Sequence, residues 1–225
     1  MRKLTPDFWL KTSIWVLGLA PLGWGVWAFF SDGLGANPVE ALLHAAGRWA
    51  LAFLLLGLAV TPVRRFTGWG RIIKVRRLLG IFAFFYAATH LLVYLGLDQG
   101  FAWSFILEDI VERPFITVGF AAFLLLLPLA GTSTRGWIRR LGRRWQLLHR
   151  LVYPAAGLAA LHFYWKVKAD TFWPLLVAAL LAVLLLARVR WPTKKRARDG
   201  HPSPALFQGP PGRTGARRAP VRRSG

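Results

Sequence analysis

Histidine is the residue type through which this chain could carry out redox or metal chemistry. The 225 residues contain no cysteine, which excludes a disulfide framework, thiolate zinc sites and cysteine-ligated iron–sulfur clusters. A neutral imidazole remains available as a metal ligand. The position of each histidine in the fold therefore decides which chemistry is open to the chain. The five histidines are His44, His90, His149, His162 and His201.

Long apolar blocks must position these histidines. Of all residues, 55% are hydrophobic, and about 20 mostly apolar residues cross the hydrocarbon core of a bilayer as a helix. The first block is longer than a usual signal-peptide core and five more follow it, so we interpret it as a retained helix. We expect an all-α integral membrane protein with six transmembrane helices. The blocks lie at about 12–30, 41–63, 78–96, 114–131, 148–167 and 172–189.

The charged residues predict the orientation of these helices. The chain has 30 Lys and Arg against 9 Asp and Glu, a net charge of +21, which alone would suggest a nucleic-acid partner. The charges alternate, however: the loops at 64–77 and 132–147 are basic, whereas those at 31–40 and 97–113 are predominantly acidic. Cytoplasmic loops are enriched in Lys and Arg. We therefore expect both termini in the cytoplasm, and we attribute the charge to topology, with no nucleic-acid partner for the helical part.

We divide the chain into a transmembrane domain, residues 1–190, and a tail, residues 191–225. The tail is rich in Pro, Gly and Arg and cannot bury enough apolar area to fold. We expect it to be disordered and cytoplasmic, where its charge fixes the orientation of the protein; anionic lipid and nucleic acid are alternative partners for it. No internal repeat and no second folded domain are apparent.

The orientation assigns a depth to two histidines. His90 lies 12 residues past Leu78, and His162 lies 14 residues past Leu148, on helices that both run outwards. At about 1.5 Å per residue, both imidazoles stand about 18–21 Å above the inner boundary. Such a pair suits a low-spin haem, whereas a bare metal ion needs three or four ligands and finds no carboxylate or Cys nearby. Bis-imidazole ligation indicates electron transfer; hydrogen bonding between helices is the alternative role.

His149 raises the question of a second redox centre. It lies 13 residues before His162, about 20 Å lower on an ideal helix. On a straight helix the two would not share a face, but Pro154 between them can kink the helix. Arg76, fourteen residues before His90, stands where a partner ligand would be expected. An arginine is a poor haem ligand but binds a propionate, a phosphate or a quinone oxygen, so a second haem is left open.

Three segments carry a family resemblance: LAVTPVRR (58–65), RRLLGIFAFFYAATHLLVYLGLD (76–98) and LGRRWQLLHRLVYPAAGLAALHFYWKVK (141–168). They closely resemble the MsrQ family, also called YedZ, the haem-binding membrane subunits of bacterial methionine sulfoxide reductase systems. The resemblance covers about residues 5 to 190, and its most specific part is the motif RxWQxLHRLVY followed by LHFxW. More distantly, the chain is similar to the transmembrane domain of ferric reductases and NADPH oxidases.

The resemblance implies a multi-pass electron-transfer subunit of the bacterial inner membrane, with a ferric-reductase-like bundle that binds b-type haem and FMN. Its partner would be a periplasmic molybdopterin-containing subunit that reduces methionine sulfoxide in proteins, so this chain is not expected to be an enzyme by itself. Electrons would come from the quinone pool or from a cytosolic flavin reductase. Matching positions suggest His90, His149 and His162 as the haem ligands. Arg76 stands where the oxidase-like domain has a histidine, so one haem is expected and a second is open.

Two charged regions could bind a cofactor or the partner. Arg64, Arg65, Arg76 and Arg77 at the inner face could hold the phosphate of FMN. The acidic loop at 97–113 could form part of the surface that docks the partner. The topology rule accounts for both charge clusters as well.

Two other functions compete with electron transfer to a partner. A small proton-coupled transporter would need acidic residues in mid-membrane, and none of the six apolar blocks contains one. A self-contained ferric-reductase-like cytochrome b would need a flavin dehydrogenase domain, which a short disordered tail does not supply.

Overall fold

The described part of the protein is helical. The computed structural model describes residues 6–167 and 170–188, in which helices alternate with short connections and no strand occurs. The predicted tail, residues 191–225, lies outside these ranges and stays a prediction. Within them the α-helices are α1 (Pro6–Phe30), α2 (Pro38–Thr67), α3 (Arg76–Leu92), α4 (Trp103–Glu112), α5 (Pro114–Gly131), α6 (Arg135–Leu141), α7 (Arg143–Leu148), α8 (Val152–Lys166) and α9 (Phe172–Leu186). The 3-10 segments η1 (Gly70–Val75) and η3 (His149–Leu151) and the π-helical segment η2 (Val93–Asp98) complete the order.

Four helical segments of the described residues are long and apolar enough to cross a membrane. They match the first four predicted blocks: α1, α2, α3 with its flanking segments η1 and η2, and α5. The block predicted at 148–167 is divided into η3 and α8, and both α8 and α9 have 15 residues. An all-α fold with several apolar helices is confirmed, whereas six crossings and cytoplasmic termini stay predictions.

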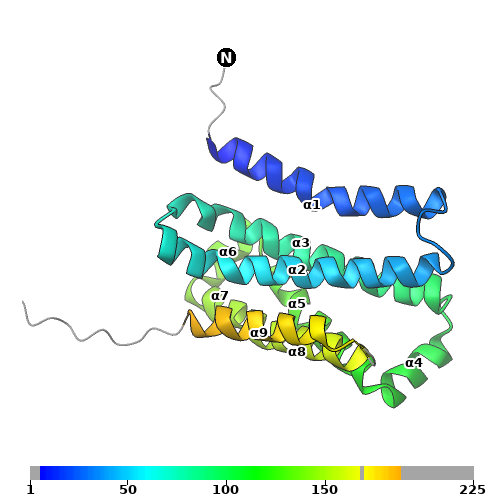
Figure 1. Ribbon diagram of the computed structural model, residues 1–225. Coiled ribbons are helices and arrows are strands. Elements are labelled where there is room, and N and C mark those ends of the chain that lie inside the picture. Colours follow the sequence, from blue (N-terminus) through cyan, green and yellow to red (C-terminus); the bar gives the residue numbers. More distant parts are fainter. Residues whose placement is uncertain (1–5, 168–169, 189–225) are drawn as a thin grey trace, which may run out of the picture. The chain divides into compact units, whose positions relative to one another are not determined.

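The long helices run back and forth, so their connections alternate between two ends (Figure 1). One end contains the α1–α2 connection and α4, which include the acidic loops at 31–40 and 97–113. The other contains η1, α6 and α7, which include the basic loops at 64–77 and 132–147. We call these the acidic end and the basic end. The short helices α4, α6 and α7 within these loops were not predicted.

Local signals in the sequence begin and end the helices. Proline occupies the first turn of α2, at Pro38, and of α5, at Pro114, where its missing N–H is not needed. The side chain of Asn37 accepts a hydrogen bond from the first turn of α2. At its other end α2 stops at Gly68, whose positive φ of 70° lets its N–H donate to the Arg64 carbonyl at 3.0 Å. These signals start α2 and α5 at the acidic end.

Two helix pairs, α2 with α3 and α5 with α8, pack most extensively. In lipid, close packing rather than the hydrophobic effect holds helices together, and small residues allow the closest approach. Phe53 of α2 stacks on Phe82 and Tyr86 of α3, with ring centroids 5.2 and 5.5 Å apart. Ala155 and Ala156 of α8 are completely buried. These two pairs support the histidines on α3 and α8.

A single side chain joins α1 to α3. The Tyr86 hydroxyl donates to the Gly18 carbonyl at 2.7 Å and accepts from the Leu22 N–H at 3.1 Å. In an uninterrupted α-helix those two backbone groups would bond to each other. Pro21 lies inside α1 next to them, and a proline disturbs the turn that precedes it. The hydroxyl therefore completes the disturbed turn of α1 and holds it against α3.

Candidate haem site

The structure brings His90 of α3 and His162 of α8 together. Their ring centroids lie 6.1 Å apart, and their planes make an angle of 77°. The equal depth predicted from the sequence is therefore present in the fold. A metal held at about 2.0–2.1 Å by one nitrogen of each imidazole would separate the ring centres by roughly 6 Å. The spacing of the two rings fits one metal between them.

The donor set suits a haem better than a bare metal ion. Among the described residues, no group of three or more His, Cys, Asp or Glu side chains could hold a metal. Two imidazoles alone leave a bare ion short of ligands. In a haem the porphyrin supplies the other four nitrogens, so two axial histidines complete the iron. The residues present thus fit a bis-imidazole haem.

Backbone carbonyls fix the orientation of both rings. His90 Nδ1 lies 2.8 Å from the Leu43 carbonyl oxygen of α2, and His162 Nδ1 lies 2.6 Å from the Phe115 carbonyl oxygen of α5. A carbonyl oxygen can only accept, so each Nδ1 must carry the proton and donate it. This leaves the Nε2 lone pair of each ring available for a metal. Such a partner on the second nitrogen is the usual way a protein orients an imidazole ligand.

The residues that hold the imidazoles were not found from the sequence. They are the Leu43 and Phe115 carbonyls and two glycines, Gly47 and Gly119, which lie against the rings of His90 and His162. Every residue has a backbone carbonyl, so the residue types do not indicate which carbonyls accept from the histidines. A usable signal was nevertheless present, because the carbonyl, the glycine and the histidine have the same spacing in both cases.

His149 lies apart from the pair, at the basic end. Its ring stacks on Trp145 with centroids 3.8 Å apart, and its Nδ1 lies 3.1 Å from the Trp145 carbonyl oxygen. It begins η3, a 3-10 turn that ends shortly before Pro154, the residue at which the sequence suggested a kink. Thirteen residues separate it from His162, which corresponds to about 20 Å along a helix. His149 could contribute only to a separate centre.

The four predicted arginines do not all meet at one place. Arg64 and Arg65 line a pocket of about 460 Å³ at the basic end of α2, whereas Arg76 and Arg77 are not part of its lining. Arg65 also donates to the Ala187 carbonyl at 3.0 Å, at the end of α9. Arg76 is half-buried and Arg77 is exposed. Arg64 and Arg65 therefore border one pocket, and Arg76 and Arg77 lie outside it.

Arg188 is a further basic residue of this end, and it was not predicted as part of a site. Its guanidinium donates to the Tyr153 hydroxyl at 3.0 Å and to the Leu58 carbonyl, and it lies 5.5 Å from the centre of the Tyr153 ring. These contacts fasten the end of α9 to α2 and α8. The signal in the sequence was a basic residue at the end of the last predicted apolar block, next to a basic tail.

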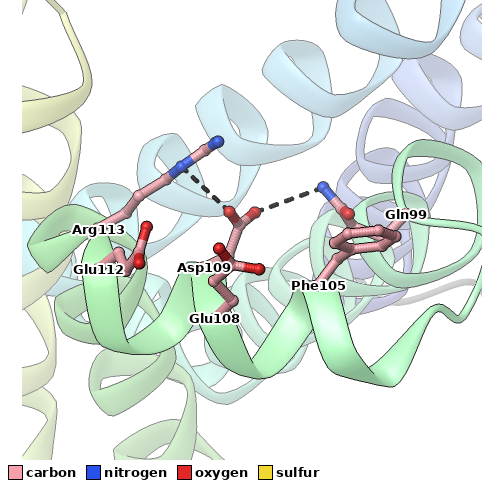
Figure 2. A pocket seen from close by; sticks show the side chains of 6 residues that line it. All are labelled: Gln99, Phe105, Glu108, Asp109, Glu112 and Arg113. Atoms are coloured by element: carbon pink, nitrogen blue, oxygen red, sulfur yellow. Dashed lines mark hydrogen bonds and ion pairs between the residues drawn. The ribbon is translucent and has the colours of Figure 1, made fainter.

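At the acidic end, α4 is fastened by a buried carboxylate (Figure 2). Asp109 pairs with Arg113 at 3.1 Å and accepts from Gln99 at 3.4 Å, and both contacts are drawn in Figure 2. The Tyr94 hydroxyl donates to the same carboxylate at 2.9 Å. Gln99, Asp109 and Arg113 border a shallow pocket of about 270 Å³. Asp109 therefore has a structural role, although the acidic loop as a whole was a predicted docking surface.

The remaining acids of that loop stay available to a partner. Glu108 and Glu112 are exposed on α4 and line the same shallow pocket as Asp109 (Figure 2), and Asp98 is exposed at the end of η2. The acidic surface formed by Asp98, Glu108 and Glu112 lies at the end of the molecule nearest the histidine pair, because Leu43 and Phe115 lie near the starts of α2 and α5.

Comparisons with known proteins bear on this site. The family described as "Ferric reductase like transmembrane component" matches residues 46–160, which include His90 and end two residues before His162. Three curated relatives are each called "Protein-methionine-sulfoxide reductase heme-binding subunit MsrQ". The one from Xanthomonas euvesicatoria pv. vesicatoria (strain 85-10) is 52% identical over 204 residues, 87% of this chain and 94% of that protein. The one from Xanthomonas oryzae pv. oryzae (strain MAFF 311018) is 53% identical over 181 residues, which cover 78% of this chain and 83% of that protein.

The third relative, from Rhodospirillum rubrum, is 52% identical over 191 residues, which cover 84% of this chain and 91% of that protein. No solved structure matches this chain. With identity above half over most of both chains, a ferric-reductase-like domain and two imidazoles spaced for one metal, the chain belongs to the MsrQ family of heme-binding subunits of protein-methionine-sulfoxide reductases.

Proposed function

We propose that this protein carries electrons across the bacterial inner membrane through a b-type haem held by His90 and His162. The observation that carries the proposal is the pair of imidazoles 6.1 Å apart, each with its Nδ1 on a backbone carbonyl. A haem bound there would accept and release one electron at a time. With His90 and His162 as ligands, the haem would have no position left for a substrate and would supply electron transfer.

Electrons enter at the basic end and leave at the acidic end. The basic end faces the cytoplasm in this proposal, because cytoplasmic loops are enriched in Lys and Arg. The histidine pair lies towards the acidic end, since both accepting carbonyls belong to the first two turns of helices that start there. The donor is the quinone pool or a cytosolic flavin reductase. The chain thus receives electrons on one side of the membrane and presents them on the other.

Two features of the basic end support a role in receiving electrons. The pocket of about 460 Å³ beside Arg64 and Arg65 is suited to the phosphate of FMN, because guanidinium groups bind phosphate in charge-assisted pairs. His149, stacked on Trp145, offers a further imidazole at the same end. A second haem ligated there would need a ligand other than Arg76 or Arg77. We propose one haem at His90 and His162 and an FMN near Arg64.

The acceptor is a periplasmic molybdopterin-containing subunit, on which methionine sulfoxide in proteins is reduced. The curated relatives are called subunits of a protein-methionine-sulfoxide reductase, which supports a catalytic partner. Exposed Asp98, Glu108 and Glu112 at the acidic end supply a charged surface for docking. Charges at the edge of an interface chiefly affect association rate and salt dependence. Replacing Glu108 and Glu112 with Gln should slow electron transfer to the partner mainly at low salt; equal rates at all salt concentrations would contradict this docking surface.

The absorption spectrum of purified protein tests the haem assignment. Wild-type protein should show a low-spin b-type haem, and His90→Ala or His162→Ala should reduce the haem content per polypeptide to background, because one imidazole cannot complete the iron. His44→Ala is the matched control, since His44 is a histidine near the same end, on α2, and its Nε2 lies 3.9 Å from the Glu40 carboxylate. Full haem content in both His90→Ala and His162→Ala would contradict the proposal.

The same preparations determine the number of cofactors. Haem and flavin measured per polypeptide should give one haem, and His149→Ala should retain it. If a second haem is present and His149→Ala removes it, His149 is one of its ligands, and its other ligand is a residue other than Arg76 or Arg77. Flavin that is lost on replacing Arg64 and Arg65 with Gln would support the proposed FMN site, and flavin unchanged in that variant would contradict it.

A further inference from the structure

The two halves of the histidine pair are built in the same way. In each half, a carbonyl near the start of one helix accepts from a histidine 47 residues later in the sequence. Four residues after each carbonyl, on the same helix, stands a glycine: Gly47 follows Leu43 and Gly119 follows Phe115. Because four residues are about one helical turn, each glycine lies directly beyond the carbonyl on the face that meets the imidazole.

The similarity extends beyond the site. Each residue of the first half, on α2 and α3, corresponds to the residue 72 positions later in the second half, on α5 and α8. At this offset buried Leu54 corresponds to buried Leu126, and buried Ala83 to buried Ala155. These residues belong to the two most extensively packed helix pairs, α2 with α3 and α5 with α8. Most residue pairs differ at this offset, which is why no repeat was apparent from the sequence.

Both glycines are in van der Waals contact with an imidazole. A Cβ atom added at Gly119 would lie 2.6 Å from His162 Nδ1 and 2.8 Å from its Cε1. A Cβ atom added at Gly47 would lie 3.1 Å from His90 Nδ1 and 3.2 Å from its Cε1. Both glycines lie inside regular α-helices, where glycine is less favourable than alanine. The close approach of the ring is therefore the physical reason for a glycine at each position.

We propose that Gly47 and Gly119 are positioning residues for the haem, each forming with its carbonyl a notch that fixes one imidazole in position and rotation. The inference rests on the proposed function, because it assumes that these imidazoles hold the haem. The carbonyl anchors Nδ1, and the absence of a Cβ lets the ring lie against the helix backbone. Together the two notches set the 77° angle between the ring planes. That angle determines the electronic structure of a low-spin ferric haem.

Alanine substitutions test the notches. In Gly119→Ala the methyl group must displace the His162 ring and lengthen its hydrogen bond to the Phe115 carbonyl. Haem affinity should fall by roughly 10–100-fold, the usual effect of losing a partner that orients a metal ligand. The electron paramagnetic resonance signal of the remaining ferric haem should change, because it reports the angle between the imidazole planes. Gly47→Ala should cause the same changes to a smaller extent, since its Cβ contacts are longer.

The chain offers matched controls on the histidine-bearing helices. A Cβ atom added at Gly80 of α3 or at Gly157 of α8 would meet nothing within 4 Å. Gly80→Ala and Gly157→Ala should therefore keep the wild-type haem content and resonance signal. Circular dichroism and gel filtration show whether each variant is folded. If Gly119→Ala does not accumulate as folded protein, Gly47→Ala carries the test alone, because its methyl group causes the milder clash.

The outcomes separate this inference from the proposed function. Unchanged haem content and an unchanged resonance signal in both Gly47→Ala and Gly119→Ala would overturn the inference, while loss of haem in His90→Ala and His162→Ala would leave the function intact. Equal changes in the Gly80→Ala and Gly157→Ala controls would also overturn it, because the effect would then not come from contact with the ring. Wild-type protein without haem would instead contradict the proposed function.

Discussion

Replacing Tyr86 with Phe removes one hydroxyl group and leaves two backbone groups of α1 without their partner. The hydroxyl donates to Gly18 at 2.7 Å and accepts from Leu22 at 3.1 Å, and the Tyr86 side chain is buried. A buried polar group without a partner costs about 1–3 kcal/mol, whereas hydrogen bonds between transmembrane helices contribute on average about 0.6 and at most about 1.7 kcal/mol. Because two groups lose a partner and Pro21 hinders their direct pairing, we expect a loss of about 1–2 kcal/mol.

Unfolding of the purified protein in mixed detergent micelles measures this loss. Tyr164→Phe is the control, because Tyr164 on α8 is 42% exposed and donates no hydrogen bond within the described residues. The haem spectrum of Tyr86→Phe should equal that of the wild type, since α1 contributes no residue to the histidine pair. The effect should appear only as an earlier unfolding transition.

A double substitution tests the physical cause. In Pro21→Ala the helix can form its own backbone hydrogen bonds, so the hydroxyl of Tyr86 becomes less important. Tyr86→Phe should then cost less in the Pro21→Ala background than in the wild type. The reasoning is refuted if Tyr86→Phe has the same unfolding midpoint as the wild type and Tyr164→Phe. It is also refuted if Tyr86→Phe lowers the free energy of unfolding equally in the wild-type and Pro21→Ala backgrounds.

Two further predictions concern packing and charge. Gly18→Ala should destabilise the protein by about 1–3 kcal/mol, the usual cost of overpacking, because its Cβ would lie 2.5 Å from the Phe82 ring; Gly23→Ala, which meets nothing within 4 Å, should not. The same unfolding assay measures both, and equal stability of the two variants would contradict the packing of α1 on α3. Asp109→Asn should lower stability by about 1 kcal/mol, because it ends the ion pair with Arg113 at 3.1 Å, and should leave the haem spectrum unchanged. A haem loss in Asp109→Asn would show that α4 also shapes the site.

The arrangement of the histidine pair could be predicted because it depends on a constant. The rise per residue of an α-helix is fixed, so counting from the helix starts placed His90 and His162 at one depth before any contact was known. The count succeeded although α8 begins later than predicted, since the 3-10 turn at His149–Leu151 precedes it. The same count could not place Arg76 and Arg77, because their long side chains are directed by tertiary contacts.

The short helices at both ends could not be predicted from apolar block length. α4 has ten residues, and its buried side includes Ile106 and the carboxylate of Asp109. A helix that buries a carboxylate does not produce a long apolar run, so its sequence was interpreted as an acidic loop. The partners of Asp109, namely Tyr94 and Arg113, become apparent only when the end of α3 and α4 are placed together.

The notches formed by Gly47 and Gly119 depend on tertiary packing. Glycine in an apolar helix usually indicates close approach to a neighbouring helix, but not which atoms approach. Here the approaching atoms are those of an imidazole, and the carbonyl one turn earlier completes the contact. The identical spacing in the two halves was present in the sequence, and it acquires a meaning only once the hydrogen bonds to Leu43 and Phe115 are seen.

Identification of the two axial ligands tests the central claim most directly. Near-infrared magnetic circular dichroism of the purified ferric protein distinguishes axial ligands of a low-spin haem by the position of the charge-transfer band. We predict a bis-imidazole band in the wild type, which is lost in both His90→Ala and His162→Ala and kept in His44→Ala. A band characteristic of any other ligand pair, or a bis-imidazole band that persists in both variants, would contradict the assignment of His90 and His162 as the haem ligands.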